Sequence, residues 1–119
     1  MIKITKELKK LIEENILAFA TCDENKNPHC IAIGDVKVVS KNQVLIGDNY
    51  MVETIDNIQK NKNVALVVWN RNENIGYELK GKAEYFTNNK WHKMVQKIHK
   101  GFPAKGAILF TINKIKKLA

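Results

Sequence analysis

The sequence has few cysteines and no long apolar segment, and each shortage excludes a class of protein. Two cysteines, Cys22 and Cys30, are too few for a disulfide framework and cannot form a zinc cage by themselves. The longest apolar runs, 64–69 and 107–110, are far shorter than the roughly 20 residues that cross a bilayer. The N-terminus is charged throughout and lacks the apolar core of a secretory signal. These absences predict a cytoplasmic protein with reduced thiols and no membrane partner.

Sequence motifs for nucleotide binding or covalent catalysis are also missing. No G-x-G-x-x-G turn or P-loop follows a predicted strand, which excludes the common dinucleotide folds. No G-x-S-x-G turn occurs, and neither cysteine lies in a recognised nucleophile motif. His92 and His99 lie seven positions apart, which does not match a helical zinc pair. The sequence therefore identifies neither a catalytic residue nor a metal site.

Arginine is scarce, although the formal net charge is +8. Lysines are spread over almost every segment, Arg71 supplies the one guanidinium, and no RRM aromatic signature or zinc finger occurs. A clustered basic surface would favour nucleic acid, whereas a dispersed one is typical of a solvated surface that also attracts small phosphorylated ligands. The dispersed lysines therefore favour a solvated surface over a nucleic-acid-binding one. Nucleic-acid binding is kept as an alternative function.

Hydrophobic periodicity predicts a single domain, 1–119, of strands and short helices. Ile4, Leu8, Leu11 and Ile12 have helical spacing, with Thr5 as a possible N-cap. Further helices are predicted over 51–60 and 90–100, the first capped by Asp48 or Asn49 and the second ending near Gly101 and Pro103. Strands are predicted over 16–22, 29–34, 36–40, 43–48, 63–70, 75–86 and 107–112. Antiparallel hairpins covered by short helices indicate an α+β, mainly β, barrel rather than a parallel sheet.

Four segments, in this order along the chain, resemble a known family. They are LAFATCDENKNPH at 17–29, ETIDNIQKNKNVALVVWN at 53–70, GYELKGKAEYF at 76–86 and PAKGAILFTINKI at 103–115. Together they resemble the short, single-domain FMN-binding split barrels related to pyridoxamine 5'-phosphate oxidase. The resemblance implies a six-stranded antiparallel split β-barrel with short flanking helices, which forms a homodimer and binds FMN between the subunits. It also implies a flavin-dependent oxidoreductase that exchanges electrons with a small-molecule donor or acceptor.

The resemblance also implies roles for individual residues. Thr54 is expected to bind the phosphate, and Asn57 to steady the start of the helix. The segment 29–33 and the strand end 46–47 are expected to border the isoalloxazine, which needs main-chain hydrogen-bonding groups and apolar walls. The full set of expected cofactor-binding residues is His29, Cys30, Ile31, Ala32, Ile33, Lys37, Ile46, Gly47, Asp48, Asn49, Thr54, Asn57, Trp69 and Lys80.

Three of these residues have an equally good alternative role. Lys37 or Lys80 could place a cation near N1 of the flavin and favour its anionic reduced form, but either suits a plain surface position. Trp69 could stack on the flavin from the partner subunit or could pack within the protein.

Glu53 departs from the family pattern, which commonly has a lysine before the threonine. A carboxylate at that position repels a phosphate at close range. The substitution leaves F420 or haem as alternative cofactors, and a flavin-binding protein without turnover as an alternative to an enzyme. If residues 24–28 form a hairpin turn, Cys22 and Cys30 are expected nearly opposite each other, where a redox pair is a minor hypothesis.

Overall fold

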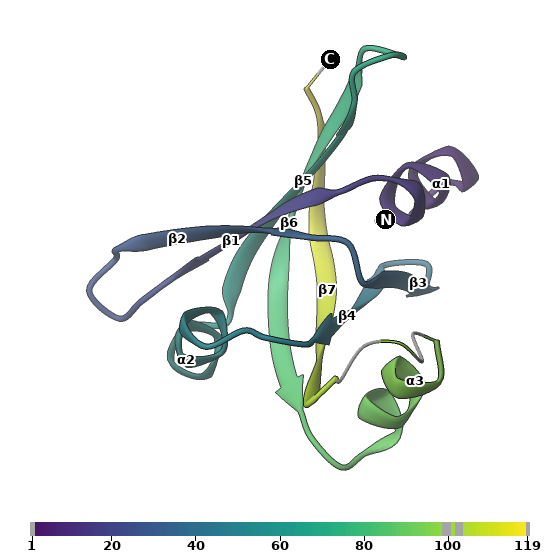
Figure 1. The fold of residues 1–119 in the computed structure, drawn as a ribbon. Helices are drawn as coiled ribbons and strands as arrows, with labels where there is room; N and C mark the ends of the chain where they lie inside the picture. Colours follow the sequence, from purple (N-terminus) through teal and green to yellow (C-terminus); the bar gives the residue numbers. More distant parts are fainter. Residues whose placement is uncertain (1, 99–100, 102–103, 119) are drawn as a thin grey trace.

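Three helices and seven strands make up the described part of the computed structural model, which covers residues 2–98, 101 and 104–118 (Figure 1). The helices are α1 (Lys6–Glu14), α2 (Glu53–Lys60) and α3 (Lys90–Ile98). The strands are β1 (Leu17–Cys22), β2 (Pro28–Ile33), β3 (Val36–Ser40), β4 (Gln43–Asp48), β5 (Asn63–Asn70), β6 (Ile75–Phe86) and β7 (Gly106–Lys117). No helix in these ranges is long and apolar enough to cross a membrane. The predicted end of the third helix, at residues 99–103, lies mostly outside the described residues.

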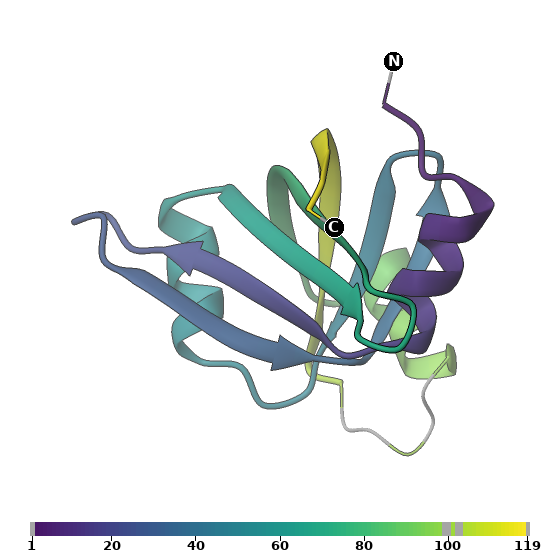
Figure 2. The same cartoon turned by 90° about the horizontal axis from the view of Figure 1, so that it is seen from above.

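The strands form one antiparallel sheet in the order β2-β1-β5-β6-β7-β4-β3. The expectation of a six-stranded barrel is wrong, because the sheet has seven strands. Three hairpins, β1–β2, β3–β4 and β5–β6, supply six strands, and β7 is the seventh, paired with both β6 and β4. The sheet is also not closed, since β2 and β3 form its two edges. These edge strands are joined only by Gly34 and Asp35, so the sheet must curl until its edges approach at that end (Figures 1 and 2).

The inner face of the curled sheet contains the main hydrophobic core. Alternate residues of β1, Leu17 and Phe19, are fully buried, and Phe19 meets Phe110 of β7 edge to face with ring centroids 6.4 Å apart. Helices α1 and α2 contribute to the same core. The predicted N-cap of α1 is confirmed, because the Thr5 hydroxyl accepts a hydrogen bond from the Leu8 N–H at 3.2 Å.

Helix α3 covers the outer face of β4 and β7. Val95 of α3 packs with Leu45 of β4 and with Ala107 and Leu109 of β7 in a second buried cluster. His92 ties α3 to the chain that leads into β7. Its Nδ1 accepts from the Asn88 N–H at 3.1 Å, so its Nε2 carries the proton and donates to the Ala104 carbonyl at 2.8 Å.

The outer face of β2, β1 and β5 is lined by small apolar side chains. Ladder pairing places Cys30, Ala20 and Ala65 in one row across the three strands. It places Ala32, Ala18 and Val67 in the next row. We call these six residues the outer alanine face. None of them belongs to either buried cluster of the described residues.

The two cysteines share this side of the sheet but do not face each other. Cys22 pairs with Pro28, and Cys30 pairs with Ala20, so the thiols are offset by two residues along the strands. Diagonal neighbours of this kind have Cα atoms about 7–8 Å apart, beyond the usual span of a disulfide. The expectation that they lie nearly opposite each other is therefore wrong, and both thiols are free.

Candidate functional site

A pocket of about 660 Å³ lies at the open edge of the sheet. Strand β2 forms one side, and the connection from β4 to α2 runs beside it as the other (Figure 2). A volume of this size accommodates a cofactor-sized ligand. The lining residues are His29, Ile31, Ala32, Ile33, Gly34, Asp35, Gly47, Asn49, Tyr50, Met51, Val52, Glu53 and Thr54.

The walls of the pocket are largely apolar. Strand β2 contributes Ile31, Ala32 and Ile33, and the opposite connection contributes Met51 and Val52. Apolar walls with a few placed polar groups are typical of small-molecule and cofactor sites. The pocket between β2 and the connection is therefore suited to a largely apolar small molecule.

The closed corner of the pocket is built from Asp35, Gly47 and Asn49. The Gly47 N–H donates to the Asp35 carbonyl at 2.8 Å, and the Asn49 Nδ2 donates to the Asp35 Oδ2 at 3.1 Å. Glycine is required at position 47, because a Cβ there would collide with the Asp35 carboxylate and lie 2.9 Å from Val95. The absence of a side chain at position 47 therefore allows Asp35 and Val95 to pack against β4.

The side-chain oxygen of Asn49 is buried and has no hydrogen-bond partner in the described part of the chain. The amide orientation is fixed, because its nitrogen must face the Asp35 carboxylate. A buried carbonyl oxygen without a partner costs about 1–3 kcal/mol, so such groups are rare in folded proteins. Asn49 therefore lines the pocket with a side-chain oxygen that lacks a hydrogen-bond partner among the described residues.

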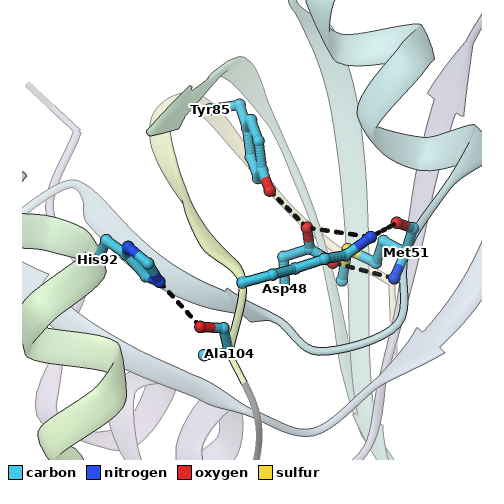
Figure 3. A network of polar contacts seen from close by, with 6 residues as sticks. Asp48, Met51, Tyr85, His92 and Ala104 are labelled. Carbon is cyan, nitrogen blue, oxygen red and sulfur yellow. Dashed lines mark hydrogen bonds and ion pairs between the residues drawn. The ribbon is translucent and has the colours of Figure 1, made fainter. Parts of the chain in front are cut away.

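Asp48 is hydrogen-bonded to the loop between β4 and α2 that lines the pocket (Figure 3). Its side chain is 0% exposed, and its two oxygens accept from the Met51 N–H at 2.9 Å and from the Tyr85 hydroxyl at 2.6 Å. Lys105 Nζ lies 3.9 Å from the Asp48 Oδ2 and donates to the Met51 carbonyl at 2.5 Å. Both backbone groups of Met51 are thus fixed, which gives the loop between β4 and α2 a defined shape.

Tyr85 is held in its protonated form by this arrangement. Burial raises the pKa of its hydroxyl well above the usual range, and the hydrogen bond to Asp48 and the charge of Asp48 raise it further. A neutral tyrosine can therefore donate to Asp48 at every ordinary pH.

Helix α2 begins at the pocket without a side-chain cap. Its N-cap is Val52, which makes no capping hydrogen bond, so the expectation that Asp48 or Asn49 caps this helix is wrong. Asp48 accepts from Met51 instead, and Asn49 reaches Asp35. The first helical residues, Glu53 and Thr54, line the pocket, and Thr54 is only 1% exposed.

Glu53 and His29 meet across the pocket. The Glu53 Oε2 lies 3.1 Å from the His29 Nδ1, which joins the start of α2 to β2. Among the described residues, no group of three or more His, Cys, Asp or Glu side chains is placed to hold a metal ion.

The structure gathers half of the expected cofactor-binding residues around this pocket. Those that line it are His29, Ile31, Ala32, Ile33, Gly47, Asn49 and Thr54. Asp48 and Ile46 are fully buried behind the lining. Asn57 lies within α2 rather than at its start, and its Nδ2 donates to the Thr21 hydroxyl of β1 at 3.0 Å. Its position attaches α2 to the sheet.

The remaining expected residues lie elsewhere on the protein. Cys30 is exposed on the outer alanine face. Lys37 is exposed on β3, and the Lys80 Nζ lies 3.8 Å from the Glu78 Oε1 on β6. Trp69 is 47% exposed at the end of β5. None of these four residues is part of the pocket lining within one copy of the chain.

Several lining residues were not expected from the sequence. They are Gly34, Asp35, Tyr50, Met51 and Val52. All lie in the two connections that follow β2 and β4, where no periodicity marks a role. The sequence did contain one signal for this site, the two-residue link between the apolar strands β2 and β3. Because β2 and β3 are the edges of the sheet, so short a link brings the two edges together.

Comparison with known proteins agrees with this architecture. An uncharacterised protein of Methanocaldococcus jannaschii is 33% identical over 99% of this chain and 83% of its own length. The crystal structure of HupZ from Group A Streptococcus superposes with a TM-score of 0.91 at 23% identity, over 97% of this chain and 94% of HupZ. An FMN-binding protein from Syntrophomonas wolfei superposes with a TM-score of 0.81 at 17% identity, over 93% and 83%. These two structures share the fold.

A match along nearly the whole chain shows which family this protein belongs to. Residues 4–119 match the pyridoxamine 5'-phosphate oxidase family, and the match includes every helix and strand described above. The chain therefore belongs to the pyridoxamine 5'-phosphate oxidase family.

Proposed function

We propose that this protein binds a flavin, with FMN as the first candidate, in the pocket between β2 and the connection from β4 to α2. The observation that carries the proposal is a pocket of about 660 Å³ with apolar walls and a few polar groups, among them Asn49, whose side-chain oxygen has no partner in the described residues. The pyrimidine end of a flavin has an N–H that such an acceptor can bind, and its dimethylbenzene end needs apolar contacts. Family membership and the fold shared with an FMN-binding protein support the same cofactor.

The chain's own residues have separate tasks in this proposal. Asn49 orients the ring, and β2 excludes water from one of its faces. Thr54, at the start of α2, lines the pocket and is the residue that the family resemblance assigns to the phosphate. A bound flavin supplies the electron-transfer chemistry, so the protein acts as an oxidoreductase toward a small-molecule donor or acceptor.

We also propose a homodimer in which the outer alanine face is the contact surface. Its two rows end at Lys80 and Glu78 of β6, so an apolar centre has a charged rim. Trp69 lies on the same side of β5, at the border of this face. In this dimer, Trp69 of one subunit approaches the pocket of the other, which is one of the two roles expected for it, and Lys80 lies at the rim of the contact.

The first experiment is an absorption spectrum of the purified protein, with mass identification of whatever heating releases. Flavin bands with FMN released are the expected result. A colourless protein that takes up no added flavin would contradict the proposal, and F420 and haem would then be tested. Binding to nucleic acid would be recognised by a steep loss of affinity with added salt.

A substitution tests the role of Asn49 directly. Asn49→Ala removes the acceptor, and we expect flavin affinity to fall about tenfold. Asn113→Ala, on an exposed part of β7, is the matched control and should bind like the wild type. An Asn49→Ala variant with unchanged affinity, measured by fluorescence titration, would show that the ring binds elsewhere.

A further inference from the structure

The pocket lacks positively charged side chains from its own chain. None of the described residues that line it is a lysine or arginine, although the protein has a net charge of +8. Its ionisable lining residues are the carboxylates of Asp35 and Glu53, the imidazole of His29 and the hydroxyl of Tyr50. The described lining thus carries two carboxylates and no lysine or arginine, although the protein as a whole is basic.

The start of α2 already has negative charge of its own. A helix N-terminus attracts anions because its first N–H groups are unpaired and its dipole is positive there. In α2, the acidic residues Glu53 and Asp56 occupy the first turn and supply that negative charge. A phosphate arriving at this turn would gain less from the helix and would meet the Glu53 carboxylate.

Glu53 is also held on the pocket side of the helix. Its Oε2 lies 3.1 Å from the Nδ1 of His29, which belongs to the opposite wall. The side chain is 66% exposed, so solvent screens its charge but leaves it beside the ligand's path.

The lysine nearest this loop in the hydrogen-bond network is already engaged. Lys105 Nζ donates to the Met51 carbonyl and lies 3.9 Å from the buried Asp48 carboxylate. Lys105 therefore fixes the loop, and a phosphate would have to compete with Asp48 for its charge.

We propose that this pocket recognises the ring system of a flavin rather than its terminal phosphate, and that Glu53 sets this specificity. The inference rests on the proposed flavin binding and deepens it. Its consequence is that riboflavin and FMN bind with similar affinity, because the described lining residues include no lysine or arginine to offset the repulsion between the phosphate and Glu53. The ligand class is a flavin with or without a phosphate.

The experiment compares two ligands that differ only in the phosphate. Riboflavin and FMN are titrated separately into the wild-type protein and into Glu53→Gln and Glu53→Lys, with flavin fluorescence as the readout. Glu7→Lys is the matched control, because Glu7 is an exposed acidic residue in the first turn of α1. All titrations use low ionic strength, where charge effects are largest.

We expect the wild-type dissociation constants for the two ligands to agree within about threefold. At separations of several ångströms in water, removing one carboxylate should tighten FMN binding by about threefold to tenfold, and adding a lysine should tighten it further. Riboflavin binding should stay unchanged in both Glu53 variants. Glu7→Lys should alter neither ligand.

Two results would overturn the inference in distinguishable ways. If wild-type protein binds FMN more than about thirtyfold tighter than riboflavin, the phosphate is recognised by charges outside this lining and Glu53 does not set specificity. If Glu53→Lys tightens both ligands equally, Glu53 acts on the pocket as a whole rather than on the phosphate. Failure of both flavins to bind would overturn the flavin assignment itself, and the inference with it.

Discussion

Tyr85 matters because it completes the hydrogen bonds of a buried carboxylate. Replacing it with phenylalanine leaves the Asp48 Oδ2 without its 2.6 Å partner, while Lys105 remains 3.9 Å away. We expect Tyr85→Phe to lower the free energy of unfolding by about 1–3 kcal/mol, measured by urea denaturation. Tyr77→Phe is the control, because no side-chain hydrogen bond of Tyr77 is present within the described residues. Equal losses in the two variants would contradict a special role for Tyr85.

The same residue predicts how stability changes at alkaline pH. The pKa of Tyr85 is raised in the folded protein, so its contribution is complete below the unfolded pKa of about 10 and is lost as pH rises above it. Wild-type stability should therefore fall between about pH 9 and pH 12, and Tyr85→Phe should show a shallower fall. Parallel curves for the two proteins would contradict the assignment.

Pairing partners at the residue scale could not be predicted from the sequence. Asp48 was expected to cap α2 or to bind the cofactor, but it accepts from Tyr85, which lies 37 positions later in the chain. Glu53 was recognised as unusual, yet its partner His29 became visible only when β2 and α2 were placed side by side. Such contacts depend on the register of the sheet, which local patterns do not specify.

At the scale of elements, α1 protects the exposed edge of β3. Edge strands present unpaired backbone groups, and here the Glu13 Oε2 accepts from the Val38 N–H at 2.9 Å. We expect Glu13→Ala to lower the free energy of unfolding by about 1 kcal/mol. Glu14→Ala, at an exposed neighbouring position on the same helix, should have little effect. Thermal unfolding of both variants measures the difference.

The contribution of Glu13 should also depend on pH. Burial acts to raise the pKa of its carboxyl, but the Val38 hydrogen bond and then Lys9 outweigh it, so the net pKa is lowered. A lowered pKa means that this stabilisation is present above the unfolded value of about 4.3 and is lost as pH falls through the folded value. The gap between wild type and Glu13→Ala should therefore narrow from pH 6 to pH 3. A gap that stays constant would show that the lost contact is not ionic.

Elements with strong periodicity were predictable, and the connections between them were not. All three helices and seven strands of the described residues overlap segments predicted from apolar spacing. The strand order was beyond local patterns, because β7 joins β6 to β4 across long stretches of chain. The pocket lies where that order places the two edges, so its connecting residues could not be assigned in advance.

At the scale of the whole molecule, the outer alanine face predicts a dimer that a single charge should disrupt. Ala20 lies at its centre, paired with Cys30 on one side and Ala65 on the other. Burying an unpaired guanidinium against such a surface costs several kcal/mol, so Ala20→Arg should raise the dimer dissociation constant by at least about a hundredfold. Sedimentation of the purified proteins measures the change. Gln59→Arg, which adds the same charge at an exposed position of α2, should leave the dimer intact.

Flavin binding by the same variants shows whether the dimer and the pocket depend on each other. If the partner subunit completes the site, Ala20→Arg should lose affinity for flavin as it becomes monomeric, and high protein concentration should restore both properties together. A monomeric Ala20→Arg that binds flavin like the wild type would place the whole site on one chain. That result would remove Trp69 and Lys80 from the cofactor's surroundings, because neither residue lines the pocket of its own subunit.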